Sequence, residues 1–165
     1  MKERWILRGL FVFGLILIPI VYRKQPIKDW ILVFLIKCFY SWFIDSFVVA
    51  SKQISYPVRI LPHIFKIHVL FDVFLFPLAC VMYNQLTYRN NTFLDIVIKV
   101  FLFSVPITLI EVWAERKTKL IKFRKNWSAW ISFATLTLSF WLVRATMGAI
   151  RMWNDRNVHN SVEEV

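Results

Sequence analysis

The chain has 165 residues, of which 58% are hydrophobic and 18% aromatic, and its formal net charge is +11. Soluble domains average about 45–50% apolar residues, so the composition argues against a water-soluble helical bundle. Clustered cations in a soluble protein would suggest nucleic-acid binding. Here most of the cations lie between apolar runs, where they act as signals for membrane topology. No nucleic-acid partner is therefore expected.

Several apolar runs have the length of a membrane-spanning helix, because a hydrocarbon core of about 30 Å requires about 20 residues. We predict an all-α, polytopic transmembrane helical bundle with about five spans, formed by a single domain at residues 1–153. The spans are expected near residues 5–22, 30–50, 60–83, 93–113 and 127–146. Residues 154–165 are expected to form a polar carboxyl-terminal tail. Bulky Ile20, Val21 and Tyr22 stand where a signal peptide would need small residues, so the first span should remain uncleaved.

The distribution of cations predicts the orientation of this bundle. Five spans would place the amino end, the second loop and the fourth loop on one side, with ten of the 21 Lys and Arg residues there and six on the other side. The positive-inside rule then predicts a cytoplasmic amino terminus and an outside carboxyl terminus. Residues 116–125 contain six of these cations and are expected to contact anionic lipid head groups.

Charged side chains within the expected spans form the candidate functional site. Lys37, Ser41 and Asp45 recur every four residues, so they share a helix face that should point into the bundle. Two further pairs show the same spacing, His68 with Asp72 and Glu111 with Glu115, and Lys119 follows Glu115 by four residues. The candidate intramembrane polar network comprises Lys37, Asp45, His68, Asp72, Glu111 and Glu115.

The helical rise predicts the depth of these charges. Lys37 should lie about 12 Å from the outer face and Asp72 about 18 Å from the cytoplasmic face, which is the same level in a slab of about 30 Å. Because an isolated charge at that depth is costly, we expect Lys37 and Asp72 to form an ion pair. Asp45 and Glu111 should form a second level nearer the cytoplasm, with Lys66 and His68 close to them.

Three roles for this polar interior follow from the residues. The charges can hold the helices in register, form a proton or cation path, or catalyse a reaction. Catalysis is disfavoured because the chain has no GxSxG, SxxK or HExxH motif and no glycine-rich phosphate loop. His63 and His68 are five residues apart, which does not suit two metal ligands on one helix face. We predict no catalytic, cofactor-binding or metal-binding residues.

Two readings of function remain open. The first is a non-enzymatic structural or accessory membrane component, which would assemble with another membrane protein or with a second copy of itself. The alternative is proton- or ion-coupled transport of a small solute through the polar interior of the bundle.

Several stretches of the chain also carry a family resemblance. They are FID at Phe43–Asp45, YPVRILP at Tyr56–Pro62, FDVFLFP at Phe71–Pro77, YNQ at Tyr83–Gln85 and PITLIEVWAERKTKLIKF at Pro106–Phe123. Together they resemble a family of small polytopic membrane proteins from spore-forming Gram-positive bacteria such as bacilli and clostridia. That family has no established biochemical activity, so the resemblance transfers no catalytic residue. It implies a location in the bacterial cytoplasmic (inner) membrane and a link with sporulation.

Overall fold

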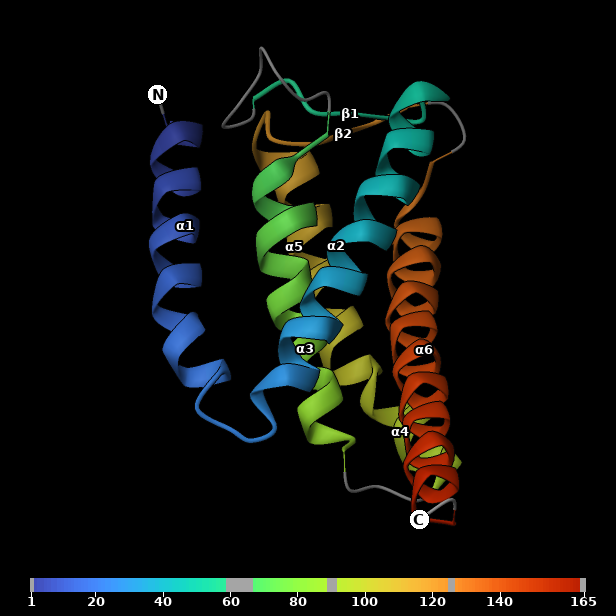
Figure 1. The fold of residues 1–165 in the computed structure, drawn as a ribbon. Coiled ribbons are helices and arrows are strands. Elements are labelled where there is room, and N and C mark those ends of the chain that lie inside the picture. The colour runs from blue at the N-terminus through green and yellow to red at the C-terminus, as the bar shows by residue number, and fades with distance from the viewer. Residues whose placement is uncertain (1, 59–66, 89–91, 125–126, 164–165) are drawn as a thin grey trace.

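The fold is an all-α bundle, as the sequence predicts. The computed structural model describes residues 2–58, 67–88, 92–124 and 127–163 (Figure 1). Its helical elements are α1 (Lys2–Val21), α2 (Ile27–Ala50), the π-helical segment η1 (Leu70–Leu75), α3 (Phe76–Leu86), α4 (Phe93–Lys99), α5 (Phe101–Lys117) and α6 (Ala129–Glu163). Two short strands, β1 (Ile54–Ser55) and β2 (Lys122–Phe123), complete the described part of the chain.

The length and composition of the helices identify a membrane protein. Among the described residues, four helical segments are long and apolar enough to cross a membrane: Lys2–Val21, Ile27–Ala50, Phe93–Lys117 and Ala129–Arg156. Many of their large apolar side chains, such as Phe39, Phe93 and Trp130, lie exposed on the outside of the bundle. In water such a surface would be unfavourable, whereas lipid covers it at no cost.

Two of the predicted spans differ from the observed helices. Residues 60–66 of the third expected span lie outside the described residues, and the apolar helix there is the shorter segment Leu70–Leu86. The fifth span was expected to end at residue 146, but α6 continues to Glu163. Since the chain has no proline after Pro106 and no glycine after Gly148, the residues expected as a polar tail contain no strong helix breaker and extend the helix.

The second and fourth loops meet at one end of the bundle. Strand β1 pairs antiparallel with β2, with Ile54 opposite Phe123. Beside this pair the backbone N–H of Arg124 donates to the carbonyl of Gln53 over 2.8 Å. Figure 1 shows the strands at the same end as the start of α1, whereas the end of α6 lies at the opposite end. The second and fourth loops, which were expected on the same side of the membrane, are therefore joined by this strand pair.

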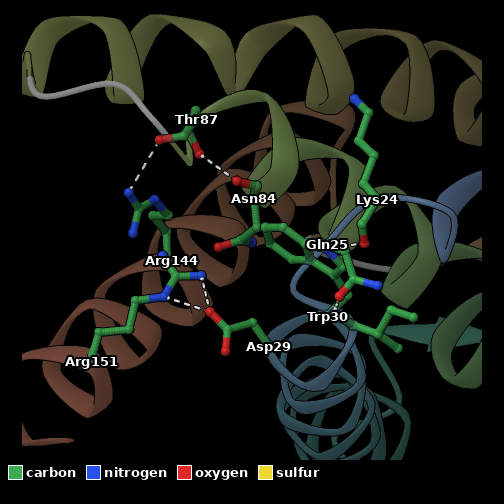
Figure 2. A network of polar contacts seen from close by, with 9 residues as sticks. Lys24, Gln25, Asp29, Trp30, Asn84, Thr87, Arg144 and Arg151 are labelled. Carbon is green, nitrogen blue, oxygen red and sulfur yellow. Dashed lines mark hydrogen bonds and ion pairs between the residues drawn. The ribbon is translucent and has the colours of Figure 1, made fainter.

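A polar network ties the helices together at the opposite end (Figure 2). Arg151 of α6 contacts the carboxylate of Asp29, at the start of α2, through Nη2 at 2.8 Å and Nε at 2.9 Å. About two turns earlier on α6, Arg144 donates from Nη2 to the carbonyl of Thr87 over 3.2 Å. The Arg151 guanidinium also lies 4.5 Å from the centre of the Tyr88 ring. These contacts connect α6 to both α2 and the end of α3.

The central part of the bundle combines apolar packing with an irregular helix. Tyr83 of α3 and Phe140 of α6 are fully buried and their rings stack with centroids 5.9 Å apart. In the first turn of α3, Pro77 has no N–H with which to bond the Val73 carbonyl. Cys38 of α2 donates to that oxygen from Sγ over 3.3 Å instead. The π-helical segment before this proline places Asp72 in the first turn, facing α2.

Candidate functional site

The polar face of α2 points into the bundle. Lys37, Ser41 and Asp45 have exposed fractions of 2%, 6% and 8%, although apolar residues surround them on the same helix. Their spacing of four residues places them along one stripe, and this stripe forms one wall of a cavity. The burial of these three residues agrees with the prediction that this face of α2 points into the bundle.

This space, called here the central cavity, has a volume of about 70 Å³ and lies between α2, η1, α5 and α6. Asp45, Asp72 and Glu111 line it together with Lys37. A water molecule needs at least about 10–15 Å³ of such volume and two to four polar partners. The central cavity has room for a few water molecules among groups that can hold them.

Two aspartates from different elements meet in the central cavity. Asp45 accepts a hydrogen bond from the Tyr56 hydroxyl over 2.7 Å and another from the backbone N–H of His68. The Asp72 carboxyl lies against that of Asp45, close enough to interact with it directly. Within the described part of the chain, atom Oδ2 of each aspartate is buried without a hydrogen-bond partner. Burial raises the pKa of Tyr56 well above its ordinary value, so this hydroxyl remains a donor.

The predicted ion pair between Lys37 and Asp72 is replaced by other contacts. Lys37 donates from Nζ to Ser139 Oγ over 2.8 Å and lies 5.2 Å from the centre of the Phe140 ring. Among the ion pairs of the described residues, none joins Lys37 to Asp72. The depth estimate failed because it counted helical rise from residue 60, whereas the described helix begins at Leu70 and puts Asp72 next to Asp45. Lys37, Asp45, Asp72 and Glu111 were expected at two different depths, but all four line one cavity.

Glu111 reaches the central cavity from α5. Its carboxyl interacts with the hydroxyl of Ser132 on α6. Ser132 Oγ in turn accepts a hydrogen bond from Trp127 Nε1 over 3.1 Å. A hydroxyl that accepts from one neighbour can donate to another, so Ser132 can donate to the Glu111 carboxyl.

The other two predicted network residues lie outside the central cavity. His68 is buried beside the rings of Tyr56 and Phe71, with centroids 5.5 and 4.5 Å away. Glu115 is half-buried and is not among the described residues that line the central cavity. Helix α5 ends at Lys117, so the expected ladder from Glu115 to Lys119 does not form along one helix. Lys66, expected near His68, is outside the described residues.

One wall of the central cavity was not predicted from the sequence. Ser132, Thr135 and Ser139 of α6 line it, and they stand at positions i, i+3 and i+7 of that helix. This spacing is typical of a single helix face and could have been found from the sequence. Tyr56 was also missed, because nothing in the sequence shows that a loop folds over the end of α2.

Comparisons with known proteins add no relative to this picture. Neither protein-family models, nor curated proteins, nor solved structures give a match to the chain. The function of the central cavity must therefore be inferred from the residues that line it.

Proposed function

We propose that this is a non-enzymatic, multi-pass membrane protein that couples movement of a small solute to protons taken up in the central cavity. The observation that carries the proposal is the contact between the Asp45 and Asp72 carboxyl groups, each with one oxygen lacking a partner within the described residues. A pair of this kind is a place where a proton can be held and released.

The chemistry of the pair supports a proton as its occupant. Two carboxylates in contact repel each other, so the pair favours a state in which they share one proton. Intramembrane carboxyl groups at such positions commonly belong to proton relays. Hydroxyl groups and a cavity wide enough for water surround the pair, and together they can pass a proton onward.

Charge balance also favours a cation over an anion. The described lining of the central cavity contains three carboxyl groups, Asp45, Asp72 and Glu111, and one ammonium group, Lys37. With one proton shared by the aspartates, two negative charges would still face one positive charge. An anion entering this space would meet a surplus of negative groups, and a cation would relieve it.

The cationic loops support an orientation for this protein. Strand β2 lies within the basic segment 116–125, and its partner β1 follows Ala50 at the same end of the bundle. We place this end in the cytoplasm, with the basic segment against anionic lipid head groups, because cytoplasmic loops carry an excess of Lys and Arg. The bacterial cytoplasmic membrane and a link with sporulation remain predictions from the family resemblance.

The polar network of Figure 2 supports the structural role as a second candidate. Asp29, Arg144 and Arg151 connect three helices at the outer end of the bundle, and none of the three lines the central cavity. Buried or half-buried ion pairs of this kind fix the register of helices. A structural or accessory component would need that network and would not need the central cavity.

Proton flux in reconstituted liposomes separates the two candidates. With a pH-sensitive dye inside and the membrane potential clamped by potassium and valinomycin, we expect wild-type protein to dissipate a pH gradient faster than protein-free liposomes even without solute, because the proton held by the aspartate pair can itself cross the membrane. Asp72→Asn should reduce the rate to the protein-free level, because an amide cannot share the proton. Asp95→Asn is the matched control, since Asp95 is exposed on α4 and does not line the central cavity; it should retain the flux. Wild-type flux no faster than that of protein-free liposomes contradicts the proposal and leaves the structural role.

A further inference from the structure

A second and larger cavity opens beside the central one. It has a volume of about 330 Å³ and lies between α1, the η1–α3 segment and α5; we call it the side groove. Small-molecule sites in proteins have volumes of about 300–1,000 Å³. Its walls are almost entirely apolar, with Leu10 and Phe13 on α1 and Leu102 and Ile107 on α5. The side groove therefore has the size and the lining of a site for an apolar molecule.

The side groove and the central cavity share a wall. Five residues line both spaces: Tyr56, Asp72, Phe76, Glu111 and Ile121. Asp72 has an exposed fraction of 4%, and within the described part of the chain its Oδ2 has no hydrogen-bond partner. A molecule in the side groove could thus bring one polar end to the carboxyl groups that we propose take up protons.

The groups around that polar end favour a positive charge. Among the described residues lining the side groove, the ionisable groups are the carboxyls of Asp72 and Glu111, the Tyr56 hydroxyl and the His68 imidazole, and no Lys or Arg is present. Lys37 of α2 does not line the side groove, and its Nζ donates to Ser139 Oγ. Phenylalanine rings, including Phe76 in the shared wall, add surfaces that attract cations.

The side groove opens towards the lipid rather than towards water. Phe13 of α1 and Leu102 and Ile110 of α5 line it with exposed fractions of 54%, 64% and 52%. On its other side α1 packs closely on η1, since a Cβ at Gly14 would stand 2.2 Å from Cε1 of Phe74. An occupant would therefore enter sideways, between α1 and α5, from the hydrocarbon region of the membrane.

We propose that the side groove binds a lipophilic ammonium cation. Its apolar body lies between α1 and α5, and its ammonium group lies against Asp72 and Glu111. This inference rests on the proposed function, because it names the class of solute whose movement is coupled to protons. The cation and the proton compete for the same carboxyl groups, so occupation by one releases the other.

Photo-crosslinking with competitors of equal chain length tests the site. The probe is an alkyl trimethylammonium that carries a diazirine, applied to the full chain in lipid nanodiscs, with crosslinked residues mapped by mass spectrometry. We expect crosslinks on the side-groove faces of α1 and α5. Dodecyltrimethylammonium should compete at least about tenfold better than dodecanol or dodecanoate, which corresponds to about 1.4 kcal/mol. Equal competition by all three overturns the proposal and indicates a groove for lipid chains. Stronger competition by dodecanoate overturns the proposal that the site prefers a cation.

Two variants locate the binding within the side groove. Ala79→Phe should fill the groove and lower specific crosslinking about tenfold or more, because Ala79 lines the groove but not the central cavity. Ala134→Phe makes the same change on the exposed face of α6 and should leave crosslinking unchanged. If Ala79→Phe does not fold, Leu17→Trp fills the groove from α1 instead. Undiminished crosslinking in a folded groove-filling variant contradicts the site.

The proton flux of the same preparations separates this inference from the proposed function. Proton flux that depends on Asp72, together with unselective crosslinking, overturns the ammonium site and retains the proton path. Selective crosslinking without proton flux overturns the proton-coupled function and retains a cation-binding groove. Ala79→Phe should lose selective crosslinking and keep the Asp72-dependent flux, because it leaves the central cavity unaltered.

Discussion

Replacing Lys37 by methionine is expected to lower the free energy of unfolding by about 3–5 kcal/mol, the range for removing one member of a buried charge set. Lys37 is the one cation among the described residues that line the central cavity, and Asp45, Asp72 and Glu111 would be left without it. Ser139 would also lose the donor that lies 2.8 Å from its hydroxyl. Reversible unfolding in mixed detergent micelles measures the effect.

A second substitution shows whether the loss comes from charge. Adding Asp72→Asn to Lys37→Met should restore at least about 1 kcal/mol, since residues that share a network show coupling of about 0.5–3 kcal/mol. Lys99→Met, at a partly exposed lysine that lies 3.7 Å from Asp95, serves as control and should cost about 0.5 kcal/mol or less. Additive losses for Lys37→Met and Asp72→Asn contradict electrostatic coupling across the central cavity.

Replacing Arg151 by leucine is expected to cost about 2–3 kcal/mol, from the charged hydrogen bond and ion pair that it forms with Asp29 and from its contact with an aromatic ring. Nε donates to Asp29 Oδ2 over 2.9 Å, Nη2 lies 2.8 Å from the same oxygen as an ion pair, and the guanidinium lies beside Tyr88. Arg151→Lys should lose roughly half as much free energy, because lysine keeps the charge and loses the planar fork. The same unfolding experiment measures both variants.

The matched control for the Arg151 variants lies on the same helix. Arg156 is exposed, so Arg156→Leu should change the free energy of unfolding by less than about 0.5 kcal/mol. Similar costs for the substitutions at Arg151 and Arg156 contradict a specific tie between α6 and α2. Proton flux should persist in folded Arg151→Leu protein, since the network of Figure 2 is separate from the aspartate pair.

Periodicity in the sequence was enough to find the membrane helices and one wall of the site. Lys37, Ser41 and Asp45 interrupt an apolar helix every four residues, and lipid would leave such groups unpartnered, so their burial follows from their spacing. The stripe of Ser132, Thr135 and Ser139 carries the same information in weaker form, because single hydroxyls are tolerated on many helix faces.

The partners across helices depend on where each helix begins, and periodicity does not fix this. The predicted third span begins at residue 60 and the described helix at Leu70, and this difference moved Asp72 from the level of Asp45 to that of Lys37, since each residue adds about 1.5 Å of depth. The tie between Asp29 and Arg151 joins residues 122 positions apart and leaves no local pattern. Glu115 has the spacing of a network residue, yet lies outside the central cavity.

Protonation of the aspartate pair is the most direct test of the central cavity. Infrared difference spectra of the full chain in nanodiscs, recorded between two pH values, report the carbonyl stretch of protonated carboxyl groups and its shift in D2O. We expect a titrating band in wild-type protein that is lost in Asp72→Asn, altered in Asp45→Asn and retained in Asp95→Asn. A titrating band that survives both Asp45→Asn and Asp72→Asn, or the absence of any such band from the wild-type protein, would contradict proton uptake by this pair.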